Sequence, residues 1–460
     1  MRTHPLGPSS PGSLEAAVGG PRGARARVPS GPARLAPVVL LLALPLTVAA
    51  LRQASCAATG WEGRAPVWRM CGSPLLASVV EDRAGRGVGA WLTGGTTLEV
   101  PLVRGLVTGL LGSLAPGTGL SQQRWVLVLW MLLAAALLAL VVVAVGSVRG
   151  HPLADPVAVA LSPVLAVGVL LSVDLVPLTL AVAAVWAWSR GRVTLAGVLG
   201  AFALLGGPLA LPVLLAAVLV PPPGVPGAVR RLVAALGVTL LLVVGPVAAV
   251  DLGLLVRPVR AWWDAGAGSG SPWSVPGLAG HPLPGWSVAV LALAGLAVAA
   301  ALAVVVSRRR PRPPLADVAL VGLVVALVTA PALPPGSALW LVPFVALAGV
   351  PWRDHLLWAG AEVVHLVAFF AWTAAATDPG HGLPAGWYAL ALGLRLVAVG
   401  RLGWVVWSRA TWGVLVRRPP ADWDEPAAPG TLGRLPAGRP VDDPRGAVGD
   451  TAYPPVTERP

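Results

Sequence analysis

Residues 125–148, WVLVLWMLLAAALLALVVVAVGSV, decide the fold class of this chain because the stretch contains no charged side chain. A helix that crosses the hydrocarbon core of a bilayer needs roughly 20 consecutive apolar residues. The stretch meets that length, and it is too long for the buried core helix of an ordinary soluble domain. We therefore expect a transmembrane helix here.

The composition of the whole chain leads to the same conclusion. Of its 460 residues, 56% are hydrophobic and only 12% are charged, which excludes a set of water-soluble globules. The formal net charge of +13 comes entirely from arginine, since the sequence has no lysine. These arginines lie between long apolar runs and do not form the polar, aromatic-interleaved surface of a nucleic-acid binder, so nucleic acid is not an expected partner.

Ten further apolar runs surround the first one. They cover residues 35–51, 156–173, 175–188, 195–220, 232–250, 288–306, 315–332, 338–350, 356–376 and 387–407. The pattern predicts an all-α fold, a polytopic transmembrane helix bundle of about twelve spans. That count requires residues 100–116 to dip into the membrane and return, or to lie at its interface. It also requires residues 195–220 to form two short helices hinged at Gly206-Gly207-Pro208.

The distribution of arginine predicts the orientation. Arg149, the turn 189–192, Arg230 with Arg231, and the cluster 307–312 all fall on one side, which the positive-inside rule assigns to the cytoplasm. We expect a multi-pass protein of the plasma membrane with both termini cytoplasmic. Residues 1–34 and 409–460, rich in Pro, Gly and charge, are expected to be disordered cytoplasmic tails on either side of a membrane domain at 35–408.

The first apolar run has a second interpretation. It precedes small residues, as the core of a long signal peptide does. We favour an uncleaved anchor because the run is longer than a signal core and many more spans follow.

Two outer loops, residues 52–99 and 251–286, have enough length to carry a function. Both cysteines, Cys56 and Cys71, lie in the first loop, on the oxidising side of the membrane, so a disulfide is favoured over free thiols. No metal site is expected, because the six histidines are scattered without ligand spacing.

Carboxylates near the apolar runs are the candidates for chemistry, since a charge inside a membrane is costly. Asp174 lies between two runs and either caps the following helix or lines an outward-facing cavity. Glu81, Asp82 and Arg83 cluster in the first loop, where a solvated surface is the ordinary explanation, and Glu99 precedes the dipping segment. For Glu362 and His365, one helical turn apart, we expect a hydrogen-bonded pair.

Tryptophan gives a weaker signal. The 20 tryptophans fit interfacial belts, but those of the outer loops could also bind carbohydrate, among them Trp273.

The first outer loop contains, in this order, Cys71-Gly72-Ser73-Pro74, Arg83 and Leu98-Glu99-Val100-Pro101. These pieces are similar to the Cys-Tyr-Ser-Asp, Arg-Gly and Glu-Tyr-Pro-Val motifs of the actinobacterial membrane proteins of glycosyltransferase family 87, which have the C-type architecture. Further similar pieces, in order, are Ser162-Pro163, Ser172-Val173-Asp174, Ser271-Pro272-Trp273, Leu339-Trp340-Leu341-Val342-Pro343, Trp352-Arg353-Asp354, Ala361-Glu362-Val363-Val364 and Asp442-Asp443-Pro444. The resemblance extends over nearly the whole chain from Leu35 onward.

This resemblance implies a transferase that takes a hexose, such as mannose, from a polyprenyl-phosphate donor. The acceptor would be a lipid or a cell-envelope glycan on the outer face, the anomeric carbon would be inverted, and an outer-loop carboxylate would act as the base. No other cofactor is implied.

The chain departs from the family pattern at the residues that matter most for the reaction. Pro74 occupies the acidic position, and two lysines expected near phosphate are missing from the regions of Gly206-Gly207-Pro208 and 330–337. One hypothesis is a rewired site with Asp174, Glu99 or Asp82 as the base and Arg104 or Arg83 on the phosphate.

Two other hypotheses remain. In one, a silent relative binds polyprenyl lipid or scaffolds partner enzymes of the cell envelope. In the other, the chain is a lipid or solute transporter, for which matching broken helices in two halves would be expected, and only one break is visible.

Overall fold

The computed structural model describes residues 35–148, 154–378 and 380–412, and every regular element in that part of the chain is a helix. The expected all-α class is therefore confirmed. The two tails predicted to be disordered lie outside the described residues, except that the last helix continues from 409 to Trp412.

The helices follow one another with short connections. The first eleven are α2 (Ala36–Leu41), α3 (Ala43–Thr59), α4 (Ala65–Trp68), α5 (Pro74–Ser78), the 3₁₀ turn η3 (Ala84–Arg86), α6 (Gly87–Leu92), α7 (Leu102–Leu114), α8 (Leu120–Ser147), α9 (Ala154–Ala160), α10 (Pro163–Gly168) and α11 (Leu175–Ser189). The others are α12 (Val193–Gly206), α13 (Ala210–Leu219), α14 (Ala228–Val250), α15 (Gly253–Asp264), η4 (Pro272–Ser274), α16 (Val275–Leu278), α17 (Gly285–Ser307), α18 (Leu315–Val328), η5 (Pro335–Trp340), α19 (Val342–Leu347), α20 (Trp352–Thr377) and α21 (Ala385–Trp412).

Six helical segments of the described chain are long and apolar enough to cross a membrane. They are Ala36–Thr59, Leu120–Ser147, Ala228–Val250, Gly285–Ser307, Trp352–Thr377 and Ala385–Thr411. Many large apolar side chains on these helices are exposed, Leu241 and Val397 among them, as expected where a helix faces lipid. The chain is a membrane-embedded helical protein.

Proline and glycine divide several predicted runs into short helices. The run 195–220 breaks at Gly206-Gly207-Pro208 into α12 and α13, as predicted. The run 156–173 also breaks, before Pro163, because proline lacks an amide hydrogen and disfavours helix at the preceding residue. The run 338–350 becomes η5 and α19, and the predicted outer loops contain the short helices α4 to α6 and α15 to α16.

The ends of α8 and α11 show how deep the turn before α11 lies. Arg190 donates from Nη2 to the carbonyl of Ser147 at 2.7 Å, so the two helices end at the same level. At a rise of about 1.5 Å per residue, α8 extends about 42 Å from that level and α11 only about 22 Å. The start of α11 therefore lies about halfway along α8. In the same part of α8, the indole of Trp130 donates to the carbonyl of Val169, a few residues before α11, at 3.2 Å.

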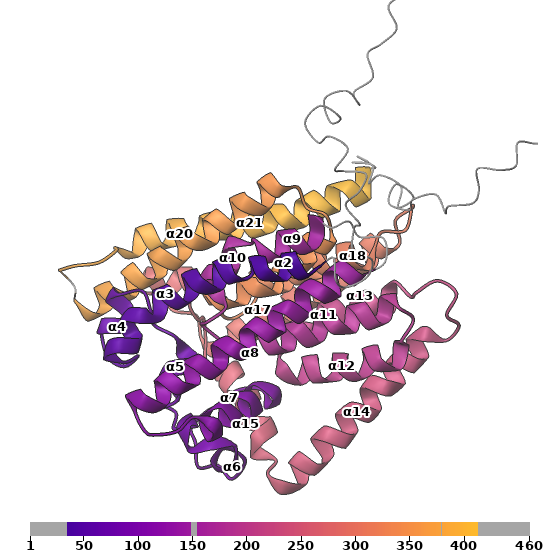
Figure 1. The fold of residues 1–460 in the computed structure, drawn as a ribbon. Coiled ribbons are helices and arrows are strands. Elements are labelled where there is room, and N and C mark those ends of the chain that lie inside the picture. The colour runs from indigo at the N-terminus through magenta and orange to yellow at the C-terminus, as the bar shows by residue number, and fades with distance from the viewer. Residues whose placement is uncertain (1–34, 149–153, 379, 413–460) are drawn as a thin grey trace, which may run out of the picture. The chain divides into compact units, whose positions relative to one another are not determined.

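The turn η3 and helix α6 pack onto α7, which in turn contacts α11 and α12 (Figure 1). Glycines form the contact face of α7. A Cβ added to Gly105 would collide with the ring of Trp91, and one added to Gly109 would lie 2.9 Å from the backbone of Val88. The expected disulfide between Cys56 and Cys71 joins the end of α3 to the segment between α4 and α5, and both cysteines are fully buried.

Candidate functional site

An ion pair joins two helices that are far apart in the sequence. Nη2 of Arg104, on α7, lies 2.7 Å from Oδ1 of Asp174, at the start of α11. The Nε of Arg104 donates to the carbonyl of Gly206 at 2.7 Å, where the break between α12 and α13 begins. Three segments singled out in the sequence, namely the dipping segment, the turn at Asp174 and the glycine break, thus meet at one place.

The capping explanation for Asp174 does not account for its side chain. Asp174 is the N-cap residue of α11, but its carboxylate accepts no capping hydrogen bond. Its backbone amide donates instead to Oγ of Ser172 at 3.3 Å. The partial positive charge at the start of α11 and the guanidinium of Arg104 both attract this carboxylate.

Both glycines of the break are required by close approach. A Cβ on Gly207 would lie 2.8 Å from Nη2 of Arg104, and a Cβ on Gly206 would lie 2.5 Å from Cβ of Pro177. Any larger residue would push the guanidinium or α11 away. The absence of two side chains thus creates the space in which Arg104 reaches Asp174.

The pair keeps unused hydrogen-bonding capacity. The Arg104 side chain is 23% exposed and that of Asp174 is 5% exposed. Within the described residues, Nη1 of Arg104 and Oδ2 of Asp174 make no hydrogen bond. The guanidinium can therefore still donate to an anionic oxygen, and the carboxylate can still accept a proton.

The segment that resembles the family's acidic motif lies beside the same turn. Oγ of Ser73 donates to the carbonyl of Leu170 at 3.0 Å. Ser73 precedes Pro74, and Leu170 precedes Asp174 by four positions. Pro74, where the family resemblance implies an acid, and Asp174 thus lie on neighbouring backbone segments.

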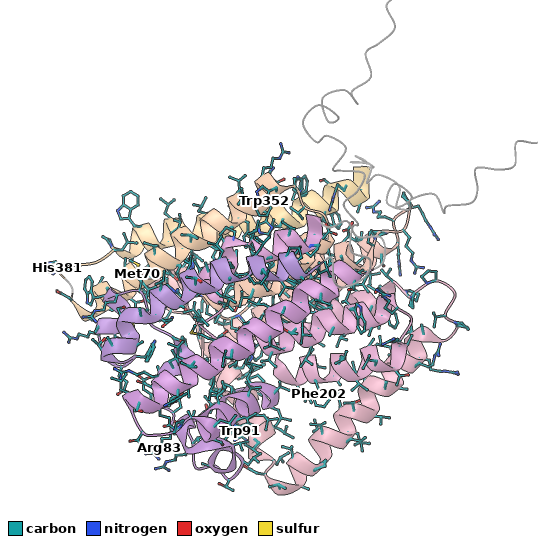
Figure 2. All side chains as sticks on the ribbon, in the orientation of Figure 1. Met70, Arg83, Trp91, Phe202, Trp352 and His381 are labelled. Atoms are coloured by element: carbon teal, nitrogen blue, oxygen red, sulfur yellow. A yellow bond between two sulfur atoms is a disulfide. The ribbon has the colours of Figure 1, made fainter. Side chains whose placement is uncertain are left out.

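The other two carboxylates predicted as the base, Glu99 and Asp82, are exposed and half-buried, respectively. Asp82 accepts from Oγ1 of Thr97 at 3.3 Å. Arg83 is exposed, has a left-handed backbone (φ 58°) and projects at the edge of the molecule, whereas Trp91 lies inside the α6–α7 corner (Figure 2). The structure brings none of these three polar residues into contact with the Arg104–Asp174 pair.

The indole of Trp273 is used for a hydrogen bond within the protein. It donates to the carbonyl of Thr329 at 3.0 Å, just beyond the end of α18. Nearby, Oγ of Ser271 donates to the carbonyl of Ala330 at 2.8 Å, and the amide of Leu333 donates to the carbonyl of Ser269 at 3.0 Å. These bonds hold residues 269–273 against the connection between α18 and η5.

In a buried polar cluster beside this connection, the sequence identified Glu362 but not its partner Arg395. Nε of Arg395, on α21, lies 2.8 Å from Oε2 of Glu362, on the adjacent α20, and both side chains are at most 2% exposed. Arg395 also donates to the carbonyls of Leu333 and Pro334, and Trp358 donates to Glu362 at 3.0 Å. An arginine inside the apolar run 387–407 was the available signal, because an intramembrane charge is rare without a function or a partner.

The expected pairing of Glu362 with His365 is wrong. Glu362 uses its two oxygens for Arg395 and Trp358. His365 is fully buried, its ring lies 5.7 Å from that of Tyr388, and neither ring nitrogen has a hydrogen-bond partner among the described residues. A full charge on the facing helix attracts the carboxylate more strongly than a neutral imidazole one turn away.

An apolar groove of about 370 Å³ lies between α17, α18 and α21. Leu302, Val324, Leu396 and Trp404 are among its lining residues, with Thr329 as its only hydroxyl. Its walls suit a hydrocarbon chain but contain no group for chemistry. Among the described residues there is also no group of three or more His, Cys, Asp or Glu that could hold a metal ion.

Comparison with known proteins does not assign this chain to a family. No protein-family model, curated protein or solved structure matches this chain.

Proposed function

We propose that this chain is a membrane glycosyltransferase that moves a hexose from a polyprenyl-phosphate donor to a lipid or cell-envelope glycan on the outer face. The observation that carries the proposal is the Arg104–Asp174 pair, which lies within the helical bundle and is positioned by a glycine break. A lipid-phosphate sugar needs a cation at its phosphate and a base at the acceptor, both within the membrane boundary.

The two side chains have complementary roles in this proposal. Nη1 of Arg104 donates to the donor phosphate and stabilises the charge that collects there as the glycosidic C–O bond breaks. Oδ2 of Asp174 accepts the proton of the acceptor hydroxyl. The hydroxyl oxygen of the acceptor then attacks the anomeric carbon from the face opposite to the departing phosphate. The products are an inverted glycoside and polyprenyl phosphate, and the proton moves from Asp174 to water.

The architecture that we propose is the C-type one with about twelve crossings. The six long helices supply six of them, and the shorter apolar helices supply the rest, with α12 and α13 entering and returning. The arginine-bearing turns then face the cytoplasm of a plasma-membrane protein, and the Arg104–Asp174 pair opens toward the outside.

Two observations favour a second candidate, a silent relative that binds polyprenyl lipid or scaffolds cell-envelope enzymes. Asp174 is already paired with Arg104, and Pro74 removes the acid expected from the family resemblance. In this case Arg104 would still bind a lipid phosphate, but no proton would be transferred.

A deletion strain separates the two candidates. Mass spectrometry of its envelope lipids and glycans is expected to show a missing hexose, restored by the wild-type gene and not by Asp174→Asn. Restoration by Asp174→Asn would support the silent relative. An unchanged envelope profile in the deletion strain would exclude both the transfer reaction and an essential scaffold.

A further inference from the structure

We propose that the arginines of three turns, 189–192, 227–231 and 307–312, form one binding surface for the headgroup of an anionic phospholipid. We call this surface the arginine patch. It lies away from the Arg104–Asp174 pair, at the opposite end of α11 and α12, and the inference does not depend on the proposed transferase activity.

Contacts between neighbouring segments bring the three turns together. Nη2 of Arg312 donates to the carbonyl of Leu219 at 3.0 Å, which holds the third turn against the end of α13. Trp188 donates from its indole to the carbonyl of Val220 at 3.1 Å. Gly191 lies so close to Val225 that a Cβ there would be 3.5 Å from the valine side chain. Turns separated by more than a hundred residues therefore share one corner of the bundle.

The patch is positive and carries no acidic residue. None of the three turns contains Asp or Glu, and their arginines are all exposed. No ion pair found in the described residues involves any of them. Arg231 donates to the carbonyl of Pro226, and Arg192 stacks over the ring of Trp186 at 5.5 Å. Carbonyl and aromatic contacts orient a guanidinium without neutralising its charge.

The acidic residue nearest to the three turns along the chain, Asp317, has other partners. Asp317, in the first turn of α18, lies 4.0 Å from Arg409 on α21 and has a further interaction. Nothing in the three turns therefore competes with an external anion for the arginines.

The position of the arginine patch beside membrane-spanning helices indicates that its ligand is a lipid. The membrane-spanning helix α14 begins within the second turn, and the membrane-spanning helix α17 ends at the start of the third. The exposed apolar side chains of α14, such as Val233, follow directly. A ligand with hydrocarbon chains along these helices would place its phosphate at the level of the arginines, where the guanidinium fork can bind two phosphate oxygens.

The experiment uses the full-length protein in detergent micelles with equal amounts of phosphatidylglycerol and phosphatidylcholine. Native mass spectrometry counts the lipids that remain bound. The test variant is Arg230→Gln, Arg231→Gln and Arg309→Gln together, which leaves the contacts of Arg190 and Arg312 intact. The matched control replaces three exposed arginines of the first outer loop, Arg64, Arg69 and Arg86, by Gln.

We expect the wild type to retain more phosphatidylglycerol than phosphatidylcholine. In the test variant, the ratio of bound phosphatidylglycerol to bound phosphatidylcholine should fall about fivefold or more. The control variant keeps it. Equal loss in both variants, or no loss in the test variant, would overturn the proposal. Displacement of phosphatidylglycerol by inorganic phosphate would also overturn it, because the patch would then be a general anion site. The helical circular dichroism signal of each variant shows that it is folded.

Discussion

The guanidinium of Arg395 and the carboxylate of Glu362 lie 2.8 Å apart inside the bundle, where both side chains are almost fully buried. Arg395 also binds the carbonyls of Leu333 and Pro334, which belong to an irregular segment between two helices. Non-helical backbone inside a membrane protein is stable only when protein groups satisfy its carbonyls. The pair therefore supports the connection to which residues 269–273 are hydrogen-bonded.

Removing one member of this pair should destabilise the protein strongly. For Glu362→Gln we expect the free energy of unfolding to fall by about 3–5 kcal/mol, because Arg395 would be left as a buried, uncompensated charge. Denaturation in detergent micelles, followed by circular dichroism, measures the change. The control is Arg257→Gln, which breaks an equally short pair with Asp251 at 2.7 Å between partly exposed side chains. There the expected change is about 0–1 kcal/mol. Similar effects of both variants would contradict the assigned role.

The glycine break should be intolerant of a single methyl group. In Gly207→Ala the new Cβ would lie 2.8 Å from Nη2 of Arg104 and would displace the guanidinium from Asp174. A displacement of about 1 Å at a reacting group can lower a rate by about 100-fold, so we expect transfer activity to fall by about that factor. Gly237→Ala on α14 is the control, since a Cβ there meets nothing within 4 Å. Full activity of Gly207→Ala would show that this contact does not position the site.

The disulfide should stabilise the first outer loop. Its cysteines are separated by 15 positions, and closing a loop of that size contributes about 3 kcal/mol in the chain-entropy account. Cys56→Ser with Cys71→Ser should therefore lower the unfolding midpoint, and added reductant should reproduce the shift in the wild type but not in the double variant. A reductant-induced shift that persists in the double variant would mean that the disulfide is not its cause.

The sequence was sufficient to predict the helical class, the hinge at Gly206-Gly207-Pro208 and the disulfide, because hydropathy and backbone-breaking residues act locally. It also identified Arg104 and Asp174 separately, since a charge between apolar runs is conspicuous. It did not predict that they pair, because their contact depends on how α7 packs against α11 and α12.

The sequence failed where the partner of a polar group lies on another element. Helical spacing placed Glu362 beside His365, but Arg395 comes from the adjacent helix α21 and carries a full charge. Trp273 appeared equally suited to a membrane interface or to a sugar, and its actual contact is a backbone carbonyl beyond α18. Such choices are made by tertiary packing, which single-sequence patterns do not contain.

The most direct test of the central claim is turnover in proteoliposomes that contain the purified protein, a polyprenyl-phosphate hexose and extracted envelope lipids as acceptors. We predict that Asp174→Asn lowers the rate of hexose transfer by about 100-fold or more, because the carboxamide cannot accept the acceptor's proton. Asp251→Asn, which alters another arginine-paired carboxylate, should retain the wild-type rate. Turnover by Asp174→Asn at the wild-type rate would contradict the account.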